Sequence, residues 1–545
     1  MKYSKKILFA AGAFSFFSCS DINEMLPEGG ALTGDQVLET TSSIPGRVAA
    51  DVAGMYAYAG QVYPAFGTTS ARHDDFGFPA ACLSEDMNGA DMVSDNSGYN
   101  WFSVASDYTD RTPNYANPYA RYANLYNQIK LANDILGSID PATEDVTLKQ
   151  YMGQAKAVRA FDYLNLAPYF QFNYQTSKDK PCVPIVTEAT ADPANNPRAT
   201  VEEVYTQIMS DLNDAITLLE GYTRPDKSKI DQQVAYGLRA RANLYMGNWA
   251  DAASDAEKAM VGYAPATIAA VSTPSFYNLN DPNWLWGILI EADKAGMLPS
   301  WPSHLGSFSA MSYTAGVGVY KRINPLLFDK IPSTDVRKGW WVDENMHSPL
   351  LSTISWNGVT GDAIAPLEIA DIKVAFTPYT NVKFGMKSGI GSSVNDCDWP
   401  LMRVEEMIFI QAEGLAMSGN TAGAQQALEN FIKANRDPSY TCRASTAEAI
   451  QLEVWKQRRI ELWGEGFSML DIMRLGKPVV RFHGNDIGIW PDAFAFNVAS
   501  DNGYLLLRFP QSETNANIGI PVTENNEGTI PKSKDNPGLL DGVTD

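Results

Sequence analysis

Two stretches of the chain repeat the same pattern of apolar and small residues. Residues 234–260 (VAYGLRARANLYMGNWADAASDAEKAM) and 407–435 (MIFIQAEGLAMSGNTAGAQQALENFIKAN) place apolar side chains three or four positions apart, with a Gly-Asn pair near the middle. Side chains at that spacing share one face of a helix, and Gly-Asn favours a turn. Each stretch is therefore predicted to form two antiparallel helices joined by a short loop.

Small residues occupy matching places in the two predicted hairpins. Ala240 and Ala252 lie twelve positions apart around the first Gly-Asn turn, and Ala412 and Ala424 lie twelve apart around the second. Small residues at these places let the two helices approach closely, which is the packing of tetratricopeptide repeats.

Helical spacing is also present in other segments, namely residues 43–60, 115–138, 149–170, 199–220 and 446–474. Together with the two clear hairpins, these segments pair into about four hairpins. The predicted fold is mainly α, with tetratricopeptide-like helical hairpins and a large irregular insert lobe.

The predicted insert covers residues 262–400, which are rich in Gly, Pro and Ser and have little helical periodicity. Long irregular insertions on a repeat scaffold are usually functional, because a rigid frame can hold loops for recognition. Seven of the twelve Trp residues of the chain lie here: Trp284, Trp286, Trp301, Trp340, Trp341, Trp356 and Trp399.

Aromatic residues in irregular segments are the candidate ligand-binding residues. Exposed Trp and Tyr rings offer a large contact area with one polar group each. A second irregular stretch, residues 84–102, contributes one of them near its end. The candidates are Trp101, Trp284, Trp286, Trp301, Tyr313 and Tyr320. The alternative is that these rings form the core of the lobe, which is the commoner fate of any single Trp.

Charge and the N-terminus restrict the partners and the location. The formal net charge of −21, from 42 basic and 63 acidic residues, argues against nucleic acid, whose binding requires a basic surface. Residues 1–18 have a basic start, a short apolar run and a small residue before Cys19, which predicts a lipoprotein signal peptide with lipidation at that cysteine. A plain secretory signal with a leftover cysteine is the alternative.

Recognisable catalytic and metal-binding motifs are missing from the sequence. The four His residues are scattered and fit no zinc-protease, nucleophile-elbow or phosphate-loop motif. The loop acids Asp86, Asp91 and Asp95 do not have EF-hand spacing, so solvated acids are expected there rather than a metal site. No cofactor is expected. The spacing of the remaining cysteines, Cys82, Cys182, Cys397 and Cys442, leaves both free thiols and disulfides open.

Residues 458–476, RRIELWGEGFSMLDIMRLG, carry paired charges inside a predicted helix. Arg458, Glu461 and Glu465 follow each other at helical spacing, so an arginine is expected to lie between carboxylates and fix the local geometry. Apolar residues resume after the two glycines. The segment is therefore predicted to be scaffold, although a pair of glycosidase carboxylates is identified only by separation in space.

The segment 454–477, VWKQRRIELWGEGFSMLDIMRLGK, closely resembles the signature of the SusD/RagB family. A second segment, RFPQSETNANIGI at 508–520, is similar to the terminal motif of that family, with Phe509 in place of Ile and with Pro510, Glu513 and Asn517 matching. With the hairpins and the insert, the resemblance covers essentially the whole mature chain.

The resemblance implies a cell-surface lipoprotein of the outer membrane that captures oligosaccharides without catalysis. Such a protein acts as a hinged lid over a SusC-like TonB-dependent transporter, its partner. The implied organisation is a signal peptide at 1–18, a helical SusD-like region at 19–261, the irregular candidate ligand lobe at 262–400 and C-terminal hairpins at 401–545. Two alternatives stay open: a repeat scaffold that only docks on the transporter, and a secreted glycosidase. The ligand is expected to be a glycan or a peptide.

Overall fold

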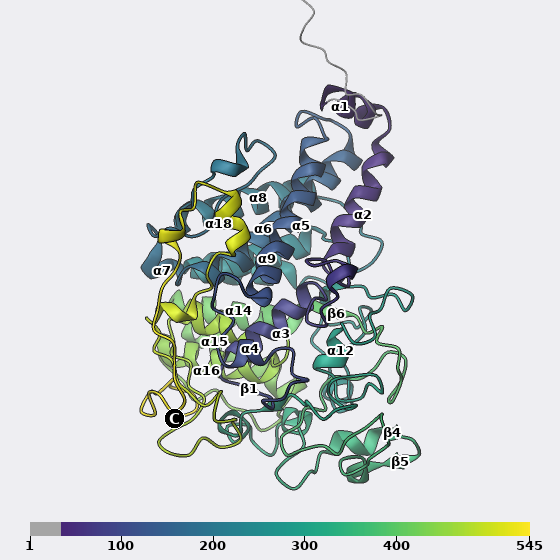
Figure 1. The fold of residues 1–545 in the computed structure, drawn as a ribbon, viewed down its shortest axis with the longest axis vertical. Helices are drawn as coiled ribbons and strands as arrows, with labels where there is room; N and C mark the ends of the chain where they lie inside the picture. The colour runs from purple at the N-terminus through teal and green to yellow at the C-terminus, as the bar shows by residue number, and fades with distance from the viewer. Residues whose placement is uncertain (1–33) are drawn as a thin grey trace, which may run out of the picture.

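The computed structural model describes residues 34–545, so the predicted signal peptide and Cys19 lie outside the described part. Long helices form a body that runs from the top of Figure 1 to its lower left, and an irregular lobe lies at the lower right. The long helices are α2 (Val48–Tyr58), α5 (Ala116–Gly137), α6 (Val146–Phe170), α8 (Val201–Leu218), α9 (Gln232–Met246), α10 (Trp249–Ala259), α14 (Val404–Met417), α15 (Thr421–Asn435) and α16 (Ala447–Glu461).

The helices of the body stack in the order of the chain. Helix α5 packs on α6, α6 on α8, α8 on α9 and α9 on α10. Helix α10 also packs directly against α14, although the insert separates these two helices in the sequence. Helices α15 and α16 then pack on α14, and α2 covers α5 and α6. The mainly α, tetratricopeptide-like fold predicted from periodicity is confirmed.

Small residues at the hairpin contacts explain this close stacking. Ala240, Ala252, Ala412 and Ala424 are fully buried. A Cβ atom on Gly414 would lie 2.5 Å from the carbonyl oxygen of Trp249, so this glycine lets α14 approach α10. The first hairpin turns where helix α9 ends, in a left-handed glycine with φ 76°.

Short elements complete the chain, and most of them lie in loops around the body. The remaining α-helices are α1 (Gly34–Ser43), α3 (Phe78–Asn88), α4 (Ser103–Ser106), α7 (Tyr174–Ser177), α11 (Ile268–Val271), α12 (Trp301–His304), α13 (Pro325–Phe328), α17 (Ser468–Leu475) and α18 (Gln511–Ala516). No helix of residues 34–545 has the length and apolar character needed to span a bilayer.

Residues 34–545 contain three two-stranded antiparallel ladders, two of which join the lobe to the rest of the chain. Strand β2 (Trp284–Ile288) pairs with β6 (Trp399–Arg403), which leads directly into α14. Strand β1 (Met92–Val93) pairs with β3 (Arg322–Ile323), and β4 (Ser355–Trp356) pairs with β5 (Val359–Thr360). Residues 262–400 otherwise hold only short helices and loops.

The helix predicted over residues 446–474 is two helices in the structure. Helix α16 ends at Glu461 and α17 begins at Ser468, with a turn between them in which Gly464 and Gly466 have φ of 82° and 88°. A Cβ atom on Gly466 would also lie 2.6 Å from the Cβ atom of Cys82. Left-handed backbone and close contact with α3 both require glycine at this position.

The carboxylate of Glu461 is the centre of a buried ion cluster. Its oxygens accept hydrogen bonds from Arg436 at 2.7 and 2.8 Å and from Arg403 at 3.2 Å, and Arg337 reaches it at 3.4 Å. Burial alone would raise the pKa of Glu461, but these guanidinium groups hold it far below its usual value. Because Arg337 lies in the lobe and Arg436 at the end of α15, the cluster fastens lobe to body.

A second carboxylate extends this cluster. Glu465 accepts hydrogen bonds from Arg403 at 2.8 and 2.9 Å and from Lys383 of the lobe at 2.8 Å. Lys383 also donates to the carbonyl oxygens of Glu461 and Trp463, at 2.9 and 2.7 Å. The turn between α16 and α17 is thereby held against the lobe.

The spacing of Arg458 had suggested that it lies between Glu461 and Glu465, but in the structure it does not. Its Nε donates to Asp471 of α17 at 2.7 Å instead. The turn after Glu461 redirects the chain, so the partners of this arginine come from the next helix.

The loop acids expected to be solvated are largely in contact with protein instead. Asp86 accepts from the backbone N–H groups of Gly466 and Ser468, and Asp91 forms a buried pair with Arg459. Asp95 pairs with Arg322 at 2.6 Å. Within the described residues, no group of three His, Cys, Asp or Glu side chains is placed to hold a metal.

The structure shows whether the four cysteines of the described chain form disulfides, which their spacing left open. Cys82, Cys182, Cys397 and Cys442 are all free and buried. Burial raises the pKa values of the Cys182 and Cys397 thiols to about 12, so both are protonated and unreactive at neutral pH.

Removing the charge of Glu461 is expected to destabilise the protein. The Glu461→Gln substitution leaves three buried guanidinium groups without their shared carboxylate, at a cost of about 3–5 kcal/mol in the free energy of unfolding. Glu144→Gln is the control, because the Glu144 side chain is 92 % exposed and pairs only with Lys149. Denaturant unfolding should separate the two variants. Equal midpoints would contradict the role of the cluster.

Candidate ligand-binding surface

Burial divides the tryptophans of the chain into two groups. Ten of the twelve indoles are buried, with at most 3 % of each residue exposed. They include all seven tryptophans of the insert, which therefore form the core of the lobe. Only Trp101 and Trp249 are half-buried, and all twelve lie within the described chain.

Four of the six candidate ligand-binding residues are in the core, and the expectation that they face a ligand is wrong. Trp284, Trp286, Trp301 and Tyr320 are at most 3 % exposed. The indole N–H of Trp301 donates to the carbonyl of Cys397 at 2.9 Å, and the hydroxyl of Tyr320 donates to that of Val374 at 2.7 Å. A ring enclosed on both faces has no surface for a ligand, so the alternative of a Trp-rich core holds for these four.

The other two candidates, Trp101 and Tyr313, lie together although they are distant in sequence. Their ring centroids are 6.3 Å apart, and the ring of His73 lies 5.2 Å from Trp101 and 5.7 Å from Tyr313. His73 Nδ1 and the Tyr313 hydroxyl are 2.5 Å apart and share a hydrogen bond. All three rings are half-exposed. We call His73, Trp101 and Tyr313, with Arg72, the aromatic cluster.

Arg72 adds a cationic, hydrogen-bonding group to the aromatic cluster. Its guanidinium lies 5.6 Å from the Trp101 ring centroid and 5.7 Å from that of Phe66. Asp74 accepts two hydrogen bonds from it, both of 2.9 Å, and this bidentate pair fixes the plane of the guanidinium. The arginine side chain stays 34 % exposed, whereas that of Asp74 is 3 % exposed.

A buried histidine joins two of the three loops that carry the cluster. His304 of α12 stacks on Tyr313 at 4.9 Å, and its Nε2 lies 2.8 Å from the carbonyl oxygen of His73. Burial lowers the pKa of His304 well below its usual value, so the ring is neutral. A carbonyl oxygen only accepts, and therefore Nε2 carries the proton of the neutral ring.

Sequence reasoning missed His73 and Arg72. The two residues lie in a loop before α3 without any motif or periodicity around them, and 240 positions separate His73 from Tyr313. Only the folded chain brings these loops together. Unlike its neighbours in the lobe, Tyr313 comes from a turn held by hydrogen bonds to Ser303, with its backbone N–H 2.9 Å from the Ser303 carbonyl oxygen.

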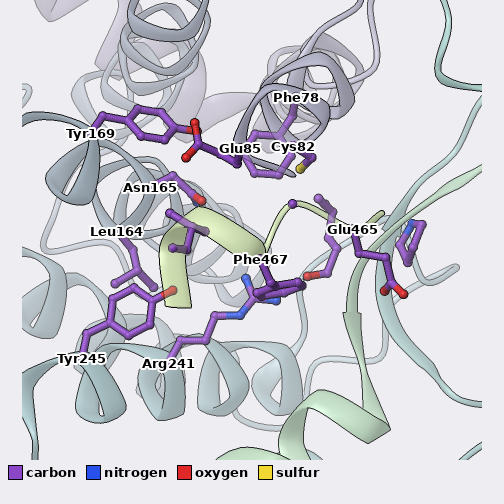
Figure 2. A pocket seen from close by; sticks show the side chains of 14 residues that line it. Phe78, Cys82, Glu85, Leu164, Asn165, Tyr169, Arg241, Tyr245, Glu465 and Phe467 are labelled. Carbon is purple, nitrogen blue, oxygen red and sulfur yellow. The ribbon is translucent and has the colours of Figure 1, made fainter. Parts of the chain in front are cut away.

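A pocket next to the Gly-Glu-Gly turn is too small to be a ligand site. Figure 2 shows Phe467 at its centre, with Arg241 and Tyr245 of α9 on one side and Glu85 of α3 on the other. Its volume of about 20 Å³ holds roughly one water molecule. The Arg241 guanidinium lies 5.3 Å from the Phe467 ring centroid and pairs with Glu406, so this region is packed scaffold.

The paired glutamates of the same segment do not form a glycosidase site. Glu461 is fully buried and Glu465 is 5 % exposed, and each is occupied by arginine or lysine partners. A hydrolytic pair has to flank a glycosidic bond, which needs open space between the two carboxyl groups. These two carboxylates serve the structure of the turn.

Comparison with known proteins decides the family. Residues 370–528 match the model of the SusD family, which spans both the charged turn and the C-terminal motif. Residues 80–244 match a second SusD-like model, described as starch-binding and associating with the outer membrane. The chain belongs to the SusD/RagB family.

Solved SusD-like structures share the fold along nearly their whole length. A SusD-like carbohydrate binding protein from Bacteroides vulgatus is 24 % identical with a TM-score of 0.70, and the match covers 87 % of this chain and 97 % of that one. A SusD superfamily protein from Bacteroides thetaiotaomicron is 20 % identical, with a TM-score of 0.62 and coverage of 88 % and 99 %. A laminarin binding SusD-like protein is 17 % identical, with a TM-score of 0.59 and coverage of 89 % and 99 %. No curated protein sequence matches the chain.

The C-terminal SusD/RagB motif has a structural task in this chain. Phe509 stacks on Phe170 of α6, with centroids 4.4 Å apart. The amide side chain of Asn517 bonds to both the N–H and the carbonyl oxygen of Asn196, at 2.9 and 2.8 Å. The motif thus holds the C-terminal segment against the helical body.

The exposure of the aromatic cluster can be tested by fluorescence. In a variant carrying both Trp101→Phe and Trp249→Phe, iodide should quench almost none of the remaining emission, because an ion cannot reach the ten buried indoles. Trp284→Phe is the control and should leave quenching as in the unchanged protein. Strong iodide quenching in the double variant would show that other indoles are exposed.

Proposed function

We propose that the protein captures glycans on the aromatic cluster and does not alter them. The observation that carries this proposal is the grouping of half-exposed Trp101 and Tyr313 with the guanidinium of Arg72. The C–H faces of sugar rings pack on aromatic planes, while the hydroxyl groups need fixed hydrogen-bonding partners. The cluster offers both kinds of contact within a single surface.

Relatives support a carbohydrate as the ligand class. The Bacteroides vulgatus neighbour is called a carbohydrate binding protein, and another neighbour is called laminarin binding. In this chain the ring faces and the guanidinium supply contacts suited to a neutral sugar, because Asp74 already balances the charge of Arg72. Capture without catalysis agrees with the occupied state of Glu461 and Glu465.

Delivery and anchoring complete the proposal. Lipidation of Cys19 would tether the mature protein to the outer membrane, where it hands its ligand to a SusC-like TonB-dependent transporter. The matched family model is described as associating with the outer membrane, and this description supports the location. The lobe at 262–400 contributes one loop of the aromatic cluster, and the segment before α5 contributes the other two.

Substitutions in the aromatic cluster should weaken glycan binding without unfolding the protein. Once a polysaccharide panel has identified a ligand, Trp101→Ala and Tyr313→Ala are each expected to weaken binding by about tenfold or more, as a stacking contact is lost. Trp249→Ala is the matched control, since Trp249 is the other half-buried indole and lies at the start of α10, outside the aromatic cluster. Calorimetric titration gives the affinities.

Three results would contradict the proposal. One is equal loss of affinity in the Trp249→Ala control. Another is full binding by both cluster variants. A third is release of reducing ends when the protein is incubated with its glycan, which would make it a hydrolase.

A further inference from the structure

A large cavity in the molecule is lined by residues other than those of the aromatic cluster. Its volume is about 470 Å³, within the range of about 300–1,000 Å³ found for small-molecule sites. Helix α2 forms one wall and residues 286–291, from β2 onward, form another. None of the four residues of the aromatic cluster lines it.

Apolar side chains make up most of this cavity. Ala53 and Ala57 of α2 line the cavity, and so do Ile288, Leu289 and Ile290. Both alanines are exposed, and Leu289 is 43 % exposed, so apolar surface is open here on two sides. Open apolar walls of this kind bind the apolar body of a ligand.

One positive charge in the lining forms no ion pair. The charged lining residues are Lys229, Glu291 and Lys294, and the last two form an ion pair with each other. Across residues 34–545, Lys229 makes no ion pair and its ammonium donates no hydrogen bond to protein. Asp226, which lies outside the lining, acts on Lys229 without forming an ion pair, so the lining itself carries one net positive charge.

The position of Lys229 is fixed by the residues on either side of it. The backbone N–H of Gly287 donates to the carbonyl of Lys227 at 3.1 Å, and the indole of Trp286 donates to that of Ser228 at 3.3 Å. The N–H of Ile230 donates to the Tyr56 hydroxyl at 3.0 Å. This segment is therefore attached to both walls of the cavity.

The ammonium of Lys229 itself lies 4.5 Å from the ring centroid of Tyr56, which also lines the cavity. The side chain is half-buried, and burial lowers its pKa. The carboxylate of Asp226 acts on this ammonium only at longer range. A half-buried ammonium without a direct ion pair loses hydration that an anionic ligand would replace.

We propose that this cavity is a second binding site, for a small amphipathic carboxylate. The apolar body of the ligand lies between α2 and residues 288–290, and its carboxylate pairs with Lys229. The site is separate from the proposed glycan surface in both its residues and its chemistry, so it goes beyond the function proposed above.

Two dyes that differ by one charge test the site. Anilinonaphthalene sulfonate has an aromatic body and a sulfonate that stands for the carboxylate, and phenylnaphthylamine has the same body without charge. Lys229→Met keeps the alkyl stem and removes the charge. It should weaken binding of the sulfonate dye by about tenfold, the value of one charge-assisted contact, and leave the neutral dye within about twofold.

Two further variants separate the cavity from other apolar surfaces. Ala57→Trp adds bulk at an exposed helix position and should weaken both dyes by about tenfold or more, as the cavity is filled. Lys294→Met is the matched lysine control and should change neither dye by more than about twofold, because Glu291 already neutralises Lys294.

The affinities of the two dyes for these variants can support or overturn the proposal. Unchanged affinity for the sulfonate dye in Lys229→Met, or for both dyes in Ala57→Trp, would overturn the proposal. An equal effect of Lys294→Met would do so as well. Glycan binding by Lys229→Met should equal that of the unchanged protein, so failure of this site and failure of the glycan surface give different results.

Discussion

The buried carboxylate of Glu461 is the contact on which the arrangement of the molecule depends. Arginines from β6, from the end of α15 and from the lobe converge on this one side chain. Burying such charges is costly unless every partner is present, because each group loses its hydration. The cluster therefore forms only when body and lobe meet in this one register, and it specifies their relative position more than it adds stability.

The turn after Glu461 extends this constraint toward the aromatic cluster. Glu465 and the carbonyl groups of the turn hold Lys383, whose neighbour Phe384 contacts Trp301 of α12. Helix α12 ends in His304, which joins the loops of His73 and Tyr313. A continuous series of contacts thus connects the charged signature with the half-exposed rings of the aromatic cluster.

The helical body could be predicted because its signals are local. The alanines of the two hairpins, the Gly-Asn turns and the apolar spacing each report on neighbours within one helix or hairpin, and the observed helices lie within a few residues of the expected ones. The helix expected over 446–474 was interrupted because Gly466 meets Cys82, a contact across 384 positions that no local pattern contains.

The aromatic site was only partly predictable for the same reason. Composition marked the insert as rich in Trp, but whether an indole such as Trp301 faces solvent depends on partners far away in sequence, here Cys397 and Phe384. Of the six candidates, only Trp101 and Tyr313 are half-exposed and lie in the aromatic cluster, and the sequence did not single out Arg72 or His73 as their neighbours. The cluster forms where three loops meet in the folded chain, and periodicity carries no information about that.

A crystal structure of the mature protein with a bound oligosaccharide tests this account most directly. We expect a sugar ring to lie against Trp101 or Tyr313, with at least one hydroxyl group hydrogen-bonded to Arg72, and the ion cluster of Glu461 to be unchanged. An oligosaccharide bound elsewhere, with both rings free and facing solvent, would contradict it.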